Sequence, residues 1–123
     1  MATQGHEIRE SGYASGDMTA DQYKFVVINS DGEVEVVAEG AAADAVLLNK
    51  PYGKRNAATL MVLGRTKTRL ASAVTAGDPI AVAANGFAKA AATGNIIVAT
   101  AIESGVADQY ITIDFFKGGN AAA

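Results

Sequence analysis

Two dipeptides constrain the fold of this chain most strongly, because each lies where a β-hairpin would reverse direction. Asp31-Gly32 separates the run YKFVVINS, which begins at Tyr23, from EVEVVA. Asn85-Gly86 separates IAVAA from FAKAA. Both central residues of a type I′ turn need a positive φ, which Asn, Asp and Gly tolerate best. The sequence therefore predicts two tight antiparallel hairpins.

The two turns also share a spacing. Gly40 follows Gly32 by eight residues, and Gly94 follows Gly86 by the same number, with an apolar run before each turn and after each later glycine. This echo predicts two similarly built hairpins in one antiparallel barrel or sandwich. Such spacing also recurs by chance in all-β chains, so it does not choose between the two architectures.

Further strand patterns follow along the chain. They are AVLLN (after AAADA, which is compatible with one helical turn), ATLMVLG, TKTRLASAV, NIIVATAIES and YITIDFF. Gly64-Arg65 suggests a turn between the second and third of these, and in the last one Ile111, Ile113 and Phe115 should share a face. About seven or eight short strands without a long helix predict an all-β fold, a small antiparallel β-barrel.

The chain is long enough for one domain and no more, with 123 residues. Residues 1–22 contain three glycines and scattered charges, and no apolar period runs through them. We expect an extended N-terminal arm over residues 1–22, a β-barrel domain over residues 23–117, and a flexible C-terminal tail, GGNAAA, over residues 118–123.

Alanine is the most abundant apolar residue, with 26 copies, so the core must be thin. Seven alanines fall in residues 76–91, although strands disfavour this residue. Small side chains let strands lie close to another layer while burying little area. These alanines either pack against copies of the chain or a larger partner, or fill a narrow barrel interior.

The basic charge is concentrated in one segment. Residues 1–49 carry nine acidic and two basic residues, whereas residues 50–69 carry six basic residues and no acid. We expect the two segments to meet across subunits or against a larger partner, with Lys54, Arg55 and Arg65 as contacts. A solvated strand face and a nucleic-acid contact are the alternatives. Only Tyr52 is interleaved as a stacking aromatic, so direct nucleic-acid binding is not expected.

The residues of an active site are missing from the sequence. There is no cysteine, and the only histidine is His6. No spacing brings a pair of carboxylates onto one element, and Asp31 and Asp44 are typical turn or capping residues. We therefore expect no enzyme activity, no catalytic residues, no metal and no cofactor. The N-terminus lacks a signal-peptide pattern, and no apolar run approaches the length of a membrane span. We therefore expect synthesis in a cytoplasm and no membrane partner.

Four segments, in this order, resemble the capsid decoration (cement) proteins of tailed bacteriophages. They are MTADQYKFVVINSDGEVEVV, AVLLNKPYGKRNAATLMVLGRTKT, VTAGDPIAVAANGFAKAA and IIVATAIESG, which together cover about residues 18–116. The resemblance implies a small β-rich fold, called a β-tulip in the lambda-type decoration proteins. It also implies homotrimers on the outside of the virion head, with the phage major capsid protein as partner and synthesis in the host bacterial cytoplasm.

In that family an N-terminal arm commonly reaches onto the major capsid protein. Ile8, Tyr13 and Met18 are the large apolar residues of the expected arm after the initiator, so these three and Arg9 are our candidate capsid contacts. The alternative function is a small ligand-binding or carbohydrate-binding module, for which the four tyrosines would form the platform. They are Tyr13, Tyr23, Tyr52 and Tyr110.

Overall fold

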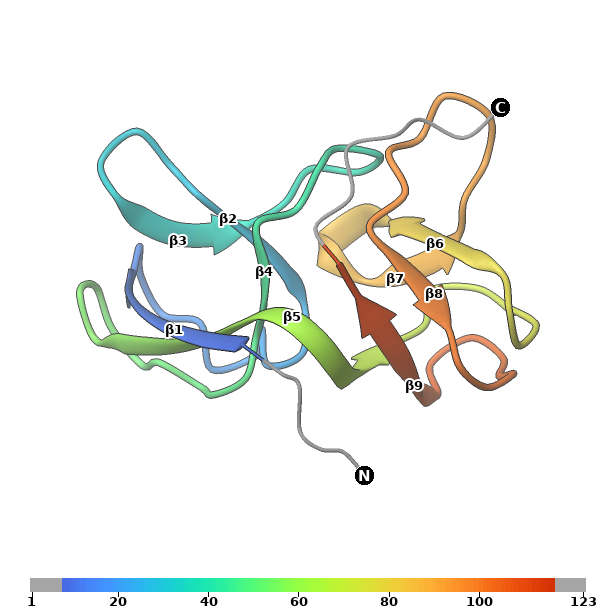
Figure 1. Ribbon diagram of the computed structural model, residues 1–123. Helices are drawn as coiled ribbons and strands as arrows, with labels where there is room; N and C mark the ends of the chain where they lie inside the picture. The colour runs from blue at the N-terminus through green and yellow to red at the C-terminus, as the bar shows by residue number, and fades with distance from the viewer. Residues whose placement is uncertain (1–7, 117–123) are drawn as a thin grey trace.

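The computed structural model describes residues 8–116 (Figure 1). It contains the strands β1 (Ile8–Ala14), β2 (Phe25–Ile28), β3 (Glu33–Val36), β4 (Ala45–Leu47), β5 (Ala57–Arg69), β6 (Pro79–Val82), β7 (Ala88–Ala90), β8 (Ala99–Ala101) and β9 (Tyr110–Phe115), and the 3₁₀ turn η1 (Ala84–Gly86). No α-helix occurs within this range. The all-β prediction is confirmed.

The strands form two five-stranded rings that share β5. In the first ring the order is β1-β3-β2-β4-β5, and β5 pairs again with β1, so the ring closes. In the second ring the order is β5-β9-β8-β6-β7, and a parallel bridge between Leu70 and Ala88 returns the chain to the end of β5. Figure 1 shows the two rings on either side of β5.

β5 replaces two strands that the sequence suggested. The expected turn at Gly64-Arg65 is wrong, because one strand of 13 residues runs through it. Its pairing passes from Leu63 opposite Ile8 to Gly64 opposite Phe115. Gly64 has a φ of 130°, a conformation that only glycine adopts without strain. The glycine therefore marks the point where one strand leaves the first ring and enters the second.

The two rings repeat one topology. Residues 26 and 80, which differ by 54, occupy equivalent positions, and the registers of the two hairpins agree pair by pair. The equivalent pairs are Val26–Val36 and Ile80–Ala90, Val27–Glu35 and Ala81–Lys89, and Phe25–Val46 and Pro79–Thr100. The single parallel pairing of each ring is also equivalent, β1 with β3 and the end of β5 with β7. The spacing echo of the turns thus belongs to an internal repeat of about half the chain.

Both predicted hairpins are present, but the first turn is not of type I′. Gly32 has a positive φ of 78°, but Asp31 does not have a positive φ. The Asn29 side chain accepts hydrogen bonds from the backbone N–H groups of Asp31 and Glu33, which stabilises a longer loop. In the second turn Asn85 and Gly86 both have positive φ, 63° and 78°, as expected.

The core follows from side-chain alternation on strands that are covered on both faces. Val26 and Leu47 point into the first ring, whereas Phe25 and Val46 point to its outside, toward the second ring. The rings of Phe25 and Phe115 lie 6.1 Å apart between the two halves. On β9, Ile111, Ile113 and Phe115 share the buried face, which confirms that prediction. The shared strand and this common core join the two rings into one unit.

The alanine-rich hairpin lines the interior of the second ring. Ala81, Ala83 and Ala88 are buried, and so are Ala99 and Ala101 on the neighbouring strand. A small ring has little interior volume, and alanine fits it where larger side chains would not. By strand alternation, Ala88, Ala99 and Ala101 share the inward face with Ile80 and Val82, so the narrow-interior interpretation accounts for these three. Ala81 and Ala83 are buried on the opposite face of β6 and its continuation.

Residues 8–22, the described part of the expected arm, belong to the folded domain. Residues 8–14 form β1, which pairs with β5 in antiparallel and with β3 in parallel orientation. Met18 is buried in the first ring, and its N–H donates to the carbonyl of Pro51. Gly12 explains how β1 fits, because a Cβ there would lie 2.9 Å from Val34 Cγ2. Residues 1–7, His6 among them, and residues 117–123, including the expected tail, lie outside the described range.

Candidate interaction surface

A mixed aromatic and charged cluster covers one end of the first ring. Tyr13 on β1 lies opposite Glu33 on β3, and the loop before β5 places Arg55 over the Tyr13 ring, 5.0 Å from its centre. Arg55 Nη1 lies 3.8 Å from Glu33 Oε2, and Lys54 Nζ lies 3.9 Å from Glu33 Oε1. Both cations are mostly exposed, whereas Glu33 is 5% exposed.

Glu33 was not identified from the sequence as a member of any site. In EVEVVA it alternates with valines, a pattern that predicts a solvated position like that of Glu35. In the fold its Oε2 is buried without a hydrogen-bond partner. Since the contacts to Lys54 and Arg55 are longer than hydrogen bonds, the two cations neutralise this carboxylate at a distance. No local sequence signal distinguishes it from a surface glutamate.

The equivalent end of the second ring carries the same residue types at permuted positions. There the arginine is Arg69, the aromatic is Phe87 and the acid is Asp108. Arg69 lies 5.1 Å from the centre of the Phe87 ring, and its Nη2 lies 3.1 Å from Asp108 Oδ1. An arginine stacked on an aromatic and close to an acid thus stabilises the parallel pairing in each ring. The feature that distinguishes the first ring is the exposure of Tyr13, Lys54 and Arg55.

The structure brings together only some of the residues selected from the sequence. Tyr13, Lys54 and Arg55 lie in one cluster, and the acid that two of them face belongs to their own chain. Ile8 and Arg9 lie at the other end of β1, opposite Leu63 and Met61 of β5. Met18 is 3% exposed and cannot contact a partner. Arg65 lies in the second half of β5, away from this cluster.

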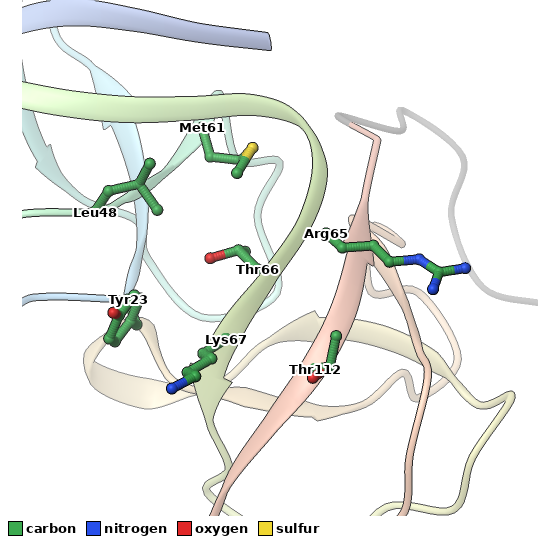
Figure 2. A pocket seen from close by; sticks show the side chains of 7 residues that line it. All are labelled: Tyr23, Leu48, Met61, Arg65, Thr66, Lys67 and Thr112. Carbon is green, nitrogen blue, oxygen red and sulfur yellow. The ribbon is translucent and has the colours of Figure 1, made fainter. Parts of the chain in front are cut away.

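Arg65 belongs to a groove of about 430 Å³ where β5 passes between the rings. The residues that line it are Tyr23, Leu48, Met61, Arg65, Thr66, Lys67 and Thr112. Figure 2 shows Tyr23, Leu48 and Lys67 on one side of β5 and Arg65 with Thr112 on the other. No local sequence pattern indicates that Tyr23 and Leu48 approach β5, because this contact depends on the closure of the first ring.

The four tyrosines do not form one flat platform. The rings of Tyr23 and Tyr110 meet edge to face, with centres 6.0 Å apart and an angle of 78° between their planes. Tyr13 stacks against Arg55, and Tyr52 lies exposed on the loop between β4 and β5. A sugar ring stacks on a flat aromatic face, so Tyr23 and Tyr110 cannot present one jointly.

Other chemistry is sparse in residues 8–116. Within this range no three His, Cys, Asp or Glu side chains lie close enough to hold a metal ion. Asp17 accepts hydrogen bonds from the backbone N–H and the hydroxyl of Thr19, which lower the pKa of its carboxyl. No helix of the described part is long and apolar enough to cross a membrane.

Comparison with protein-family models finds no match, and neither does comparison with curated proteins. Among solved structures, the fold is similar to that of the N base of head fibre gp8.5 in bacteriophage phi29. The TM-score is 0.71 at 16% sequence identity, over 94% of this chain and 99% of that one. At this identity the similarity establishes the shared fold, and the fold covers almost the whole of both chains.

Proposed function

We propose that this chain is a structural protein of a bacteriophage head. In this proposal it binds the outer surface of the assembled capsid as trimers at three-fold positions, contacts the major capsid protein, and stabilises the head as a decoration protein. The observation that carries the proposal is the fold shared with the phi29 head fibre N base over 99% of that chain. The sequence resemblance to decoration proteins, which rests on other residues and their order, points to the same class.

The proposed mechanism is stabilisation by selective binding. A protein that binds only the assembled shell lowers the free energy of that shell by RT ln(1 + [L]/Kd) per site. A trimer multiplies modest contacts through effective concentration. The mechanism needs a rigid body and a contact surface, and it needs no active site, which is consistent with the sparse chemistry of the described residues.

The contact surface that we propose is the exposed cluster of the first ring. Tyr13 supplies an amphipathic aromatic, a residue type enriched in interface centres, and Lys54 and Arg55 supply charge. Ile8 and Arg9, at the other end of β1, are further candidate contacts. Arg65, which we also selected as an electrostatic contact, lies apart in the groove and is considered separately below.

Cosedimentation with capsids tests the proposal. Purified protein should pellet with mature capsids of its phage that lack it, and Tyr13→Ala should reduce the bound fraction about tenfold. Tyr110→Ala is the matched control, because Tyr13 and Tyr110 are 53% and 52% exposed and lie in different rings. Equal binding by both variants would remove the cluster from the interface.

The charged part of the cluster needs a separate variant. Reversal of the two cluster cations, Lys54 and Arg55, together should weaken binding strongly at low salt, whereas single reversals should have little effect, since exposed ion pairs contribute only about 0 to 1 kcal/mol each. Protein that fails to pellet with any capsid, or that shifts duplex DNA with a steep salt dependence, would contradict the proposed function.

A further inference from the structure

We propose that the groove along the second half of β5 binds an acidic peptide segment in an extended conformation. This site is separate from the capsid-contact cluster, and the inference does not depend on the proposed function. It stands on three features of the groove: its charge, the spacing of its cations, and a strained tyrosine in its wall.

The charge of the groove opposes that of the whole chain. The chain has a net charge of −3, yet both charged residues that line the groove, Arg65 and Lys67, are basic. Lys67 lies opposite the neutral Thr112 on β9, and Arg65 lies opposite Asp114, which faces the same side of the ladder but does not line the groove. A local basic site on an acidic protein attracts an anionic partner.

The spacing of the two cations selects the shape of that partner. Arg65 and Lys67 are two residues apart on one strand, about 6.6 to 6.8 Å along it, and Figure 2 shows their side chains reaching to opposite sides of β5. Carboxylates on alternate residues of an extended peptide have the same spacing. Such a peptide, lying over β5 between the two side chains, would present one acid to each cation and an apolar side chain toward Leu48.

The backbone of Tyr23 is strained, and the fold requires this backbone conformation but does not require a tyrosine to adopt it. It has a φ of 67°, a region that bulky side chains rarely adopt. Its equivalent in the second ring, 54 residues later, is Gly77, with a φ of 92°. The two N–H groups donate to equivalent carbonyls, Leu47 and Ala101. The position therefore needs a left-handed backbone, which glycine supplies without strain, and a tyrosine here is retained for its side chain.

The walls of the groove are fixed before any ligand arrives. The Thr68 hydroxyl donates to the carbonyl of Tyr23 at 3.1 Å, and the Gln22 side chain donates to the carbonyl of Leu48 at 2.9 Å. A preformed site loses little conformational entropy on binding. Single-stranded nucleic acid suits the groove less well, since Tyr23, the one aromatic that lines it, already packs against Tyr110.

Fluorescence polarisation with a labelled Glu-Leu-Glu-Leu-Glu-Leu peptide at low salt tests the inference. The full chain should bind this probe saturably, and the reversal R65E/K67E should weaken binding at least tenfold. K50E/K89E is the matched control, because it changes the net charge equally at two residues outside the groove and should change binding less than twofold. Equal losses in the two variants would mean general charge attraction and would overturn the site.

Two uncharged variants make the result independent of whether the reversal folds. Thr112→Trp should narrow the groove and weaken binding at least fivefold. Tyr23→Gly should keep the melting temperature within a few degrees, since it exchanges strain for lost packing, while it also weakens binding at least fivefold. Unchanged binding in both variants, or tighter binding of an acidic oligosaccharide such as oligogalacturonate than of the peptide, would overturn the proposal.

Discussion

Met18→Ala measures whether the segment before β2 belongs to the folded body. Met18 is 3% exposed among Val26, Val34, Leu47 and Leu60 of the first ring. Its replacement removes the side chain beyond Cβ and leaves a cavity, because the closed ring around it cannot collapse freely. Buried Met→Ala substitutions cost about 2 to 5 kcal/mol, and we expect about 3 kcal/mol here.

Thermal unfolding followed by circular dichroism is the appropriate measurement. For a domain of this size each kcal/mol corresponds to roughly 3 to 5 °C, so the melting temperature should fall by about 10 to 15 °C. Tyr13→Ala, in the same segment but exposed, should lower it by no more than about 4 °C, because it loses only a surface cation–π contact of about 1 kcal/mol. Equal and small effects of both substitutions would refute the assignment of residues 8–22 to the first ring.

Two further predictions concern the turns. Gly86→Ala should cost about 2 to 4 kcal/mol in chemical denaturation, since its φ is +78° and a Cβ would lie 2.6 Å from Val36 Cγ1, whereas Gly94→Ala, at a φ of +89° with open space around it, should cost about 1 kcal/mol. Equal costs would contradict the tight packing of the second hairpin on the first ring. The pKa of Asp17 should lie below that of an ordinary aspartate, because Thr19 donates two hydrogen bonds to its carboxyl, so its contribution to stability is complete above the unfolded pKa and is lost as the pH falls through the lower folded value. An NMR titration of its carboxyl measures this, and Thr19→Ala should move the pKa only part of the way back, because the backbone hydrogen bond remains.

The hairpins were predictable because their signals are local. Asp31-Gly32 and Asn85-Gly86 mark turns whatever the rest of the chain does, and the alternation around Ile113 predicts a half-buried strand without knowledge of its neighbours. The predicted turn at Gly64-Arg65 was wrong for the same reason, because it also rested on a local signal. A glycine between two apolar runs predicts a turn, and only the change of pairing partners from β1 to β9 shows that it is a bend inside one strand.

The candidate sites were less predictable because they depend on ring closure. Glu33 lies beneath Lys54 and Arg55 because β1 pairs in parallel with β3, a long-range contact that no sequence window contains. β1 itself was missed since its residues, IRESGYA, show no two-residue apolar period. Gly12 provides the space for β1 against Val34, but a glycine in a charged segment reads as flexibility until the partner is known.

The internal repeat separates what the fold requires from what it does not. Where the two rings carry the same residue types at the same end, although at permuted positions, as with the arginine, aromatic and acid of each parallel pairing, the packing of a small ring is sufficient explanation. Where they differ at a costly position, as with Tyr23 against Gly77, packing is not sufficient, because the second ring adopts the same backbone without the strain. The single strained member of an otherwise repeated pair lines the basic groove. Because the fold is duplicated, each ring serves as a reference for the other. The comparison of Tyr23 with Gly77 indicates a function for the groove between the rings and not for the core of either ring.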